Sequence, residues 1–110
     1  MTRTSRIWRL YAGDELLGDL VVDGGDFPWL AARFEPLPAY RPFRPLFDED
    51  VRLLDGAVED VEAQVASDRA MRAAAIALAD PDGFRVPEFL LHIRGEQAWW
   101  RWNDEPFDDD

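Results

Sequence analysis

The side chains best suited to chemistry lie in two short stretches that combine arginine with aromatic residues. The first is DFPWLAARFEPLPAYRPFRPLF (residues 26–47), and the second is FLLHIRGEQAWWRW (residues 89–102). Guanidinium groups bind carboxylates and phosphates through paired hydrogen bonds, and an imidazole can exchange a proton or donate to a ligand. From these stretches we select six candidate ligand-binding residues: Arg33, Arg41, Arg44, His92, Trp99 and Arg101.

A purely structural role for the same residues is the alternative. In that interpretation His92, the only histidine, is a half-exposed strand residue that packs on Trp99. The rings of residues 26–47 then seal the core, while the arginines pair with acidic residues of a helix. We favour the structural role for His92 and for most of the rings, and we regard the arginines as the less explained part.

The sequence gives little support to an enzyme. It contains no cysteine, which excludes thiolate nucleophiles and sulfur-ligated metals, and it lacks the G-x-S-x-G pattern of a nucleophile elbow. The turn at Asp80-Pro81-Asp82-Gly83 has two carboxylates but not the remaining ligands of a calcium loop. We therefore predict no catalytic residue, no metal ligand and no cofactor, and we lean towards a protein that is not an enzyme.

The net charge of −11 is concentrated in the second part of the chain. Residues 1–47 balance six arginines against six acidic residues, whereas residues 48–110 set six arginines against seventeen. A protein that binds nucleic acid needs a basic surface, so direct binding to DNA or RNA is not expected. The charge also raises the hypothesis of an acidic mimic, or of a protein that neutralises a basic partner.

The two stretches must be positioned by a sheet. Residues 5–12 and 15–23 flank Gly13-Asp14, a strong signal for a two-residue hairpin. With Ala12 opposite Glu15, one face is predicted to hold Ile7, Tyr11, Leu16 and Leu20. The other face is then predicted to hold Trp8, Leu10, Leu17 and Val21. A third strand is expected from Trp29 to Glu35, with Leu30, Ala32 and Phe34 on one side.

A helical region is predicted after the proline-rich stretch. Asp48 is a suitable N-cap, and apolar residues then recur at steps of three and four: Val51, Leu54, Val58, Val61 and Val65. Gly56 divides this region, so we predict a helix to about Asp55 and a longer one from about Ala57 to Ala79. A single kinked helix is the alternative. The prolines of residues 26–47 exclude an ordinary helix or central strand there, and this stretch is interpreted as the crossover from sheet to helix.

The last part of the chain predicts a second hairpin around Gly95-Glu96. If Arg94 lies opposite Gln97, one face is wholly apolar: Phe89, Leu91, Ile93, Trp100 and Trp102. We expect this face to pack against the valine stripe of the helix. The predicted fold is therefore α+β, with an antiparallel sheet of about five strands (order of elements βββ-α-ββ) and the helix packed on one face.

The motifs DFPW, RFEPLPAY, RPLF and FLLHIRGEQAWWRW resemble those of small, uncharacterised, single-domain proteins from GC-rich bacteria. The resemblance covers residues 7–103 and implies a stand-alone domain without a known function or active site. We expect one domain over residues 1–110, with a frayed acidic tail from about residue 104. No apolar run is long enough to span a bilayer, and a cytoplasmic location is expected.

These features lead us to expect a small acidic protein-interaction module that is not an enzyme and that binds another protein or itself. A small-molecule or anion-binding domain that uses the arginines and His92 is the first alternative. The acidic mimic is the second.

Overall fold

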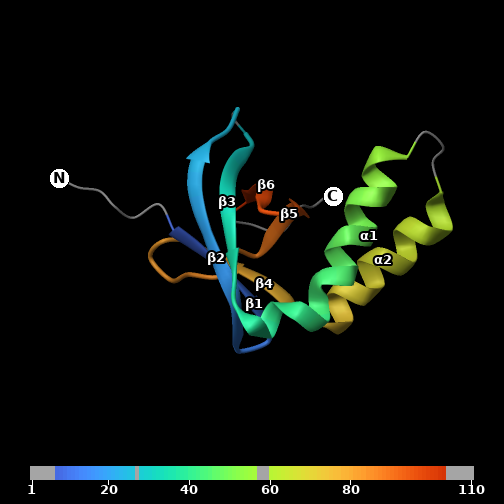
Figure 1. Cartoon of the computed structure of the whole chain (residues 1–110), viewed down its shortest axis with the longest axis horizontal. Coiled ribbons are helices and arrows are strands. Elements are labelled where there is room, and N and C mark those ends of the chain that lie inside the picture. Colours follow the sequence, from blue (N-terminus) through green and yellow to red (C-terminus); the bar gives the residue numbers. More distant parts are fainter. Residues whose placement is uncertain (1–6, 27, 57–59, 104–110) are drawn as a thin grey trace.

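The computed structural model describes residues 7–26, 28–56 and 60–103 of the chain. Six antiparallel strands form one sheet in the order β4-β1-β2-β3-β6-β5, which is nearly closed into a barrel, and two helices lie beside it (Figure 1). The α+β class is confirmed, but the predicted strand number and element order are wrong because the chain forms an additional strand after the helices. The predicted tail from residue 104 lies outside the described residues.

The elements follow one another in this order: β1 (Ile7–Ala12), β2 (Glu15–Gly24), β3 (Leu30–Pro36), the 3-10 helix η1 (Pro38–Phe43), α1 (Arg44–Asp55), α2 (Val61–Ala73), β4 (Ile76–Ala79), β5 (Glu88–Arg94) and β6 (Gln97–Asn103).

The first hairpin has the predicted turn but not the predicted faces. Ala12 pairs with Glu15, yet the register shifts after Tyr11, so that Leu10 lies opposite Gly18 and Trp8 opposite Leu20. The extra residue in β2 is a β-bulge, and it reverses which side chains point inward beyond it. Leu20 is therefore fully buried in the core with Trp8 and Leu10, and the prediction that Val21 joins them is wrong.

The second hairpin has the predicted register along its whole length. Arg94 pairs with Gln97, and the pairing continues to Phe89 opposite Trp102. Its apolar face points into the barrel, where Trp100 is fully buried and its ring lies 5.4 Å from that of Trp8. The prediction that this face packs against the valine stripe is wrong, because the curled sheet supplies the opposing core residues itself.

Strand β4 occupies residues that were predicted to be helical. Helix α2 ends at Ala73, and Ala75 adopts a positive φ of 56° that redirects the chain. The carbonyl of Ala75 accepts a hydrogen bond from the Gly13 amide, and β4 then pairs with β1. A run of small and apolar residues fits a helix or a buried strand, so periodicity alone did not separate them.

Residues 38–47 of the proline-rich stretch form η1 and the first turn of α1, whereas residues 30–36 form β3. The prediction that the prolines exclude a central strand there is wrong, because β3 lies between β2 and β6 and Pro36 falls only at its end. Tyr40 and Phe47 are buried, and the Tyr40 ring lies 4.7 Å from that of Phe34, so these rings close the core as expected. Helix α1 begins at Arg44 with a proline in its first turn, where the missing amide proton costs nothing. Asp48 is therefore inside the helix, and its prediction as the N-cap is wrong.

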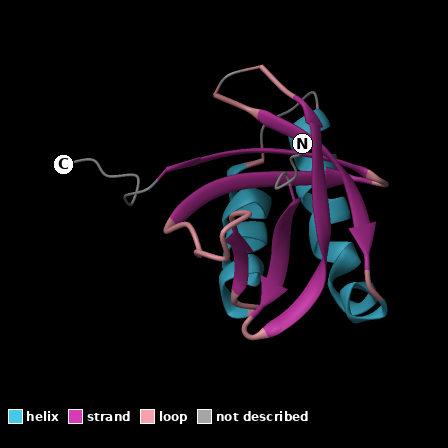
Figure 2. Cartoon of the chain, turned by 90° about the vertical axis from the view of Figure 1, so that its left-hand side faces the viewer, coloured by secondary structure: helices cyan, strands magenta, loops and turns pink. Residues whose placement is uncertain are grey.

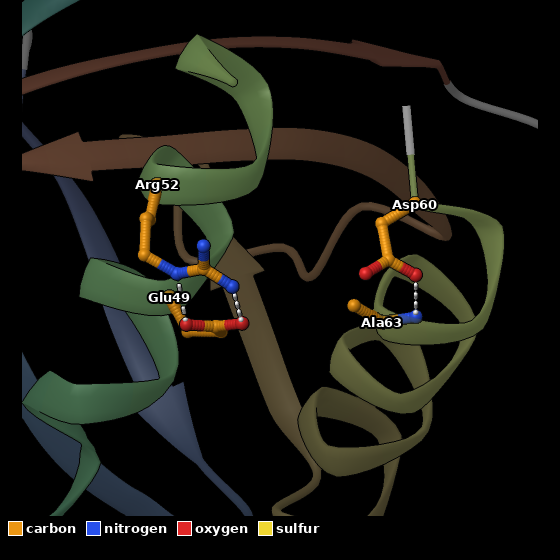
Figure 3. Close-up of polar contacts among 4 residues, drawn as sticks. All are labelled: Glu49, Arg52, Asp60 and Ala63. Atoms are coloured by element: carbon orange, nitrogen blue, oxygen red, sulfur yellow. Dashed lines mark hydrogen bonds and ion pairs between the residues drawn. The ribbon is translucent and has the colours of Figure 1, made fainter. Parts of the chain in front are cut away.

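The helices form a hairpin at the side of the sheet, and Figure 2, viewed from the sheet side, shows both helices behind the strands. The division into two helices is confirmed, with Gly56 as the C-cap of α1. The Asp60 carboxylate caps α2 by accepting from the Ala63 amide at 3.0 Å, and Arg52 donates twice to the carboxylate of Glu49 on α1 (Figure 3). The predicted start at residue 57 lies outside the described residues, and none of the described helices is long and apolar enough to cross a membrane.

Candidate functional site

The site is built around a hydrogen bond that joins β5 to α1. His92 Nδ1 lies 2.6 Å from Asp50 Oδ2, and only 15% of the His92 side chain and 12% of the Asp50 side chain are exposed. An ionised carboxylate only accepts hydrogen bonds, so the donor to such a group is the N–H of Nδ1. The bond fixes the orientation of the imidazole and holds the middle of α1 against the sheet.

Two indole rings flank the same histidine. The Trp29 ring stacks on His92 at 6.1 Å between centroids, and the Trp99 ring lies at 5.4 Å with a 41° tilt. Trp99 also carries the Arg94 guanidinium over its ring at 5.4 Å, and Arg94 donates to Asp55 at 2.5 Å. The pair of Arg94 and Asp55 is therefore a second polar contact between β5 and α1, beside the one between His92 and Asp50.

A groove of about 520 Å³ opens between α1, α2 and β5 beside this histidine. The volume falls within the range of ligand pockets in proteins. The apolar part of its lining comes from both helices and both ends of the sheet: Phe47, Met71, Ile76, Pro87, Phe89, Leu90 and Leu91. The polar part combines three carboxylates with a guanidinium, an amide and an imidazole: Asp50, Gln64, Asp68, Arg72, Glu88 and His92.

Exposed apolar side chains lie on both helices, outside the groove lining but at helical spacing from residues of that lining. Leu54 lies one and two turns beyond Asp50 and Phe47 on the same side of α1, and it is 51% exposed. On α2, Val61 and Val65 precede Asp68 at the spacing of one helical face, and they are 63% and 48% exposed. These three residues belong to the predicted valine stripe, whose first member, Val51, is buried, and whose Val58 lies outside the described residues.

Arg33 and Trp99 line a second hollow, of about 390 Å³, on the outer surface of β3 and β6. Arg33 already donates to the Glu35 carboxylate at 2.6 Å and 3.1 Å. That bond, together with the charges of Glu35, Asp23 and Glu96, raises the pKa of Arg33. This acidic surrounding disfavours the anion site that the arginines suggested.

The other predicted residues lie apart from the groove lining. Arg44 lies at the start of α1, 3.9 Å from Asp48, and Arg41 is exposed on η1. Arg101 is exposed on β6 opposite Leu90. The structure thus brings together His92 and Trp99 and places Arg33 with Trp99 in the second hollow, whereas Arg41 and Arg44 line neither hollow.

Asp50 is a site residue that the sequence did not identify, and Trp29 was considered beside the arginines of residues 26–47 but not beside His92. Asp50 belongs to a run of acidic residues that were assigned to the helix start, and no local signal distinguishes the one that meets the histidine. Trp29 was placed among the rings that seal the core, whereas its ring stacks on His92.

Within the described residues, no group of three or more histidine or acidic side chains is arranged to hold a metal ion. The chain matches no protein-family model, and no curated protein and no solved structure is significantly similar to it.

Proposed function

We propose that this protein is a non-enzymatic interaction module that binds a segment of another protein in the groove between α1, α2 and β5. The observation that carries the proposal is the row of exposed apolar side chains at that groove. Leu90 of its lining is 48% exposed, and the exposed Leu54, Val61 and Val65 lie on the same two helices at helical spacing from the lining residues Asp50 and Asp68. Contiguous apolar surface of this kind is typical of a binding site, whereas single exposed apolar residues are ordinary.

The hairpin of helices supports the proposal through its packing. Helix α2 contacts α1 and β4 only sparsely, and Ser67 is the one buried residue of α2. The helix keeps an amphipathic sequence although few of its apolar residues are buried in the chain itself. A partner that covers Val61 and Val65 supplies the burial that favours such a helix.

A small-molecule site is the second candidate, and the hydrogen bond between His92 and Asp50 favours it. An imidazole oriented by a carboxylate at the edge of a pocket is a common arrangement for holding a polar ligand. The groove is open and mixed in polarity, however, and it continues into exposed leucine and valine side chains. Those side chains fit a protein segment better than a small polar compound.

The experiment compares capture of partners by matched variants. Purified wild-type protein, Leu90→Asp, Val65→Asp and the control Phe84→Asp are immobilised and exposed to proteins of the source organism. Phe84 is 71% exposed and does not line the groove, so its variant controls for an added surface charge.

The proposal expects a protein that wild type and Phe84→Asp retain and that both groove variants lose by at least tenfold. The purified protein must then bind wild type directly in calorimetry. Retention of the same partner proteins by the wild type and all three variants rejects the groove as the binding site. Light scattering of the free protein identifies the case in which a second copy of the chain is the partner.

A further inference from the structure

The groove meets β5 at its edge. Every residue from Pro87 to His92 belongs to the lining, although alternate side chains of a strand point to opposite faces. A cavity lined by side chains from both faces of a strand must lie beside the edge of that strand, where its backbone is exposed. Strand β5 is also the last strand in the sheet order, so this edge has no neighbouring strand in the described part of the chain.

The hairpin register identifies the backbone groups that point into the groove. Arg94 and Gln97 close a two-residue turn, and such a pair exchanges both of its backbone hydrogen bonds. The bonds then recur at every second residue, so His92 and Leu90 bond to β6. The amides and carbonyls of Phe89 and Leu91 point away from β6, towards the open edge.

The opposite side of the groove is the other end of the sheet. Ile76 of β4 belongs to the lining, and β4 is the first strand in the sheet order. One end of the seam between β4 and β5 is already closed, because Ala79 forms a bridge with Arg85 and the Val86 amide donates to Leu78 at 3.0 Å. The remaining seam, at Ile76 and residues 88–91, is the part that the groove occupies.

The charge and the side-chain pattern restrict the occupant. Phe89 and Leu91 lie on one face of β5, and Glu88 and Leu90 lie on the other, as their alternation requires. A strand added at this edge meets Phe89 and Leu91 on one face, and Leu90 with the Glu88 carboxylate on the other. The helical region over residues 44–73 carries eight acidic residues against four arginines, so the surroundings favour cations.

We infer that the partner segment binds as an added β-strand on the edge of β5, with apolar residues alternating with Lys or Arg. This inference rests on the proposed function and names the chemistry of the partner. Strand addition uses main-chain hydrogen bonds for affinity and alternate side chains for specificity. The added strand pairs with Phe89 and Leu91 and fills the open part of the seam.

The test uses a synthetic octapeptide of alternating valine and arginine with blocked ends. Two further peptides carry N-methyl groups, one on the two central valines and one on the two central arginines. Valines placed beside Phe89 and Leu91 direct their amides at β5, whereas arginine amides point away from it. The charge and the side chains are the same in all three peptides, and only the backbone donors differ.

Binding is measured by fluorescence polarisation, and amide exchange in the protein is followed by NMR. The inference expects the valine-methylated peptide to bind at least about tenfold more weakly than the parent, and the arginine-methylated peptide to bind within about threefold of it. Exchange at Phe89 and Leu91 slows in the complex. Asp68→Arg in the groove weakens binding, whereas Glu62→Arg on the same helix, outside the groove lining, weakens it less.

Equal binding by all three peptides, or unchanged exchange at Phe89 and Leu91, overturns strand addition. So does a parent octapeptide that does not bind. These results leave the capture experiment with Leu90→Asp and Val65→Asp untouched, since a captured partner can use the groove in another way. Loss of that capture pattern rejects the proposed function itself.

Discussion

His92 on β5 and Asp50 on α1 are 42 positions apart in the sequence, and their side chains meet at 2.6 Å with little exposure to solvent. This contact connects the helical hairpin to the sheet beside the groove. This groove wall is therefore held by a part-buried hydrogen bond, by the buried Phe47 and Val51 side chains of α1, and by the exposed pair of Arg94 and Asp55.

Replacing Asp50 by alanine should lower the free energy of unfolding by about 1–3 kcal/mol, because the buried His92 donor loses its acceptor. Asp55→Ala is the matched control. Its pair with Arg94 is half-exposed, so about 0–1 kcal/mol is expected. The free energies of unfolding of both variants are measured in urea. Equal losses for Asp50→Ala and Asp55→Ala would contradict a larger contribution of the bond between His92 and Asp50.

The glycines of β2 give a second matched comparison. A Cβ on Gly18 would lie 2.7 Å from the Phe34 ring and 2.8 Å from the Glu35 carbonyl oxygen, whereas a Cβ on Gly24 would meet no atom within 4 Å. Gly18→Ala should therefore cost about 1–3 kcal/mol. Gly24→Ala should change stability by less than about 1 kcal/mol, in either direction. Equal urea midpoints for the two variants would contradict the close packing of β2 on β3.

Tyr40 should make the fold sensitive to alkali. Burial, and secondarily the charge of Asp48, raise the pKa of its phenol. In the unfolded chain the phenol begins to lose its proton near its ordinary pKa of about 10. At that pH the folded state still holds the proton, because its pKa is higher. The resulting stability is complete below that pH and declines above it.

Urea midpoints between pH 8.5 and pH 11 measure this effect. The chain has neither lysine nor cysteine, so few other groups interfere in this range. Wild type should lose more stability across it than Tyr40→Phe, which has no phenol to ionise. Parallel pH profiles for the two proteins would contradict the burial of this hydroxyl.

The parts of the fold that local chemistry determines could be predicted. Both hairpins have the expected turn pairs, Ala12 with Glu15 and Arg94 with Gln97, because a two-residue turn fixes the register beside it. Gly56 ends α1 as expected. Each of these features depends on residues that are neighbours in the sequence.

The features that depend on distant contacts could not be predicted. The bulge in β2 moves Leu20 to the core face, and it becomes visible only when β1 and β2 are aligned. Residues 76–79 form strand β4 because they pair with the edge of β1. Nothing in the sequence of these four residues indicates that pairing. The closure of the sheet then provides the core partners that were assigned to the helix.

In the candidate site, too, the local features could be predicted and those that depend on distant contacts could not. The neighbourhood of His92 and Trp99 came from the hairpin register, which the structure confirms. The partner Asp50 lies on another element, and the groove arises from the arrangement of α1, α2 and β5. Side-chain type selected the histidine, but only the packing shows which of the many carboxylates it meets.

Mapping the surface that contacts a captured partner tests the central claim most directly. The unlabelled partner is added to the isotope-labelled protein, and changes in the backbone amide signals are assigned by NMR. The account predicts that the largest changes fall on Gln64, Asp68, Met71 and residues 88–91, with little change at Phe84. Changes that leave these groove residues unaffected and gather elsewhere on the barrel would contradict it.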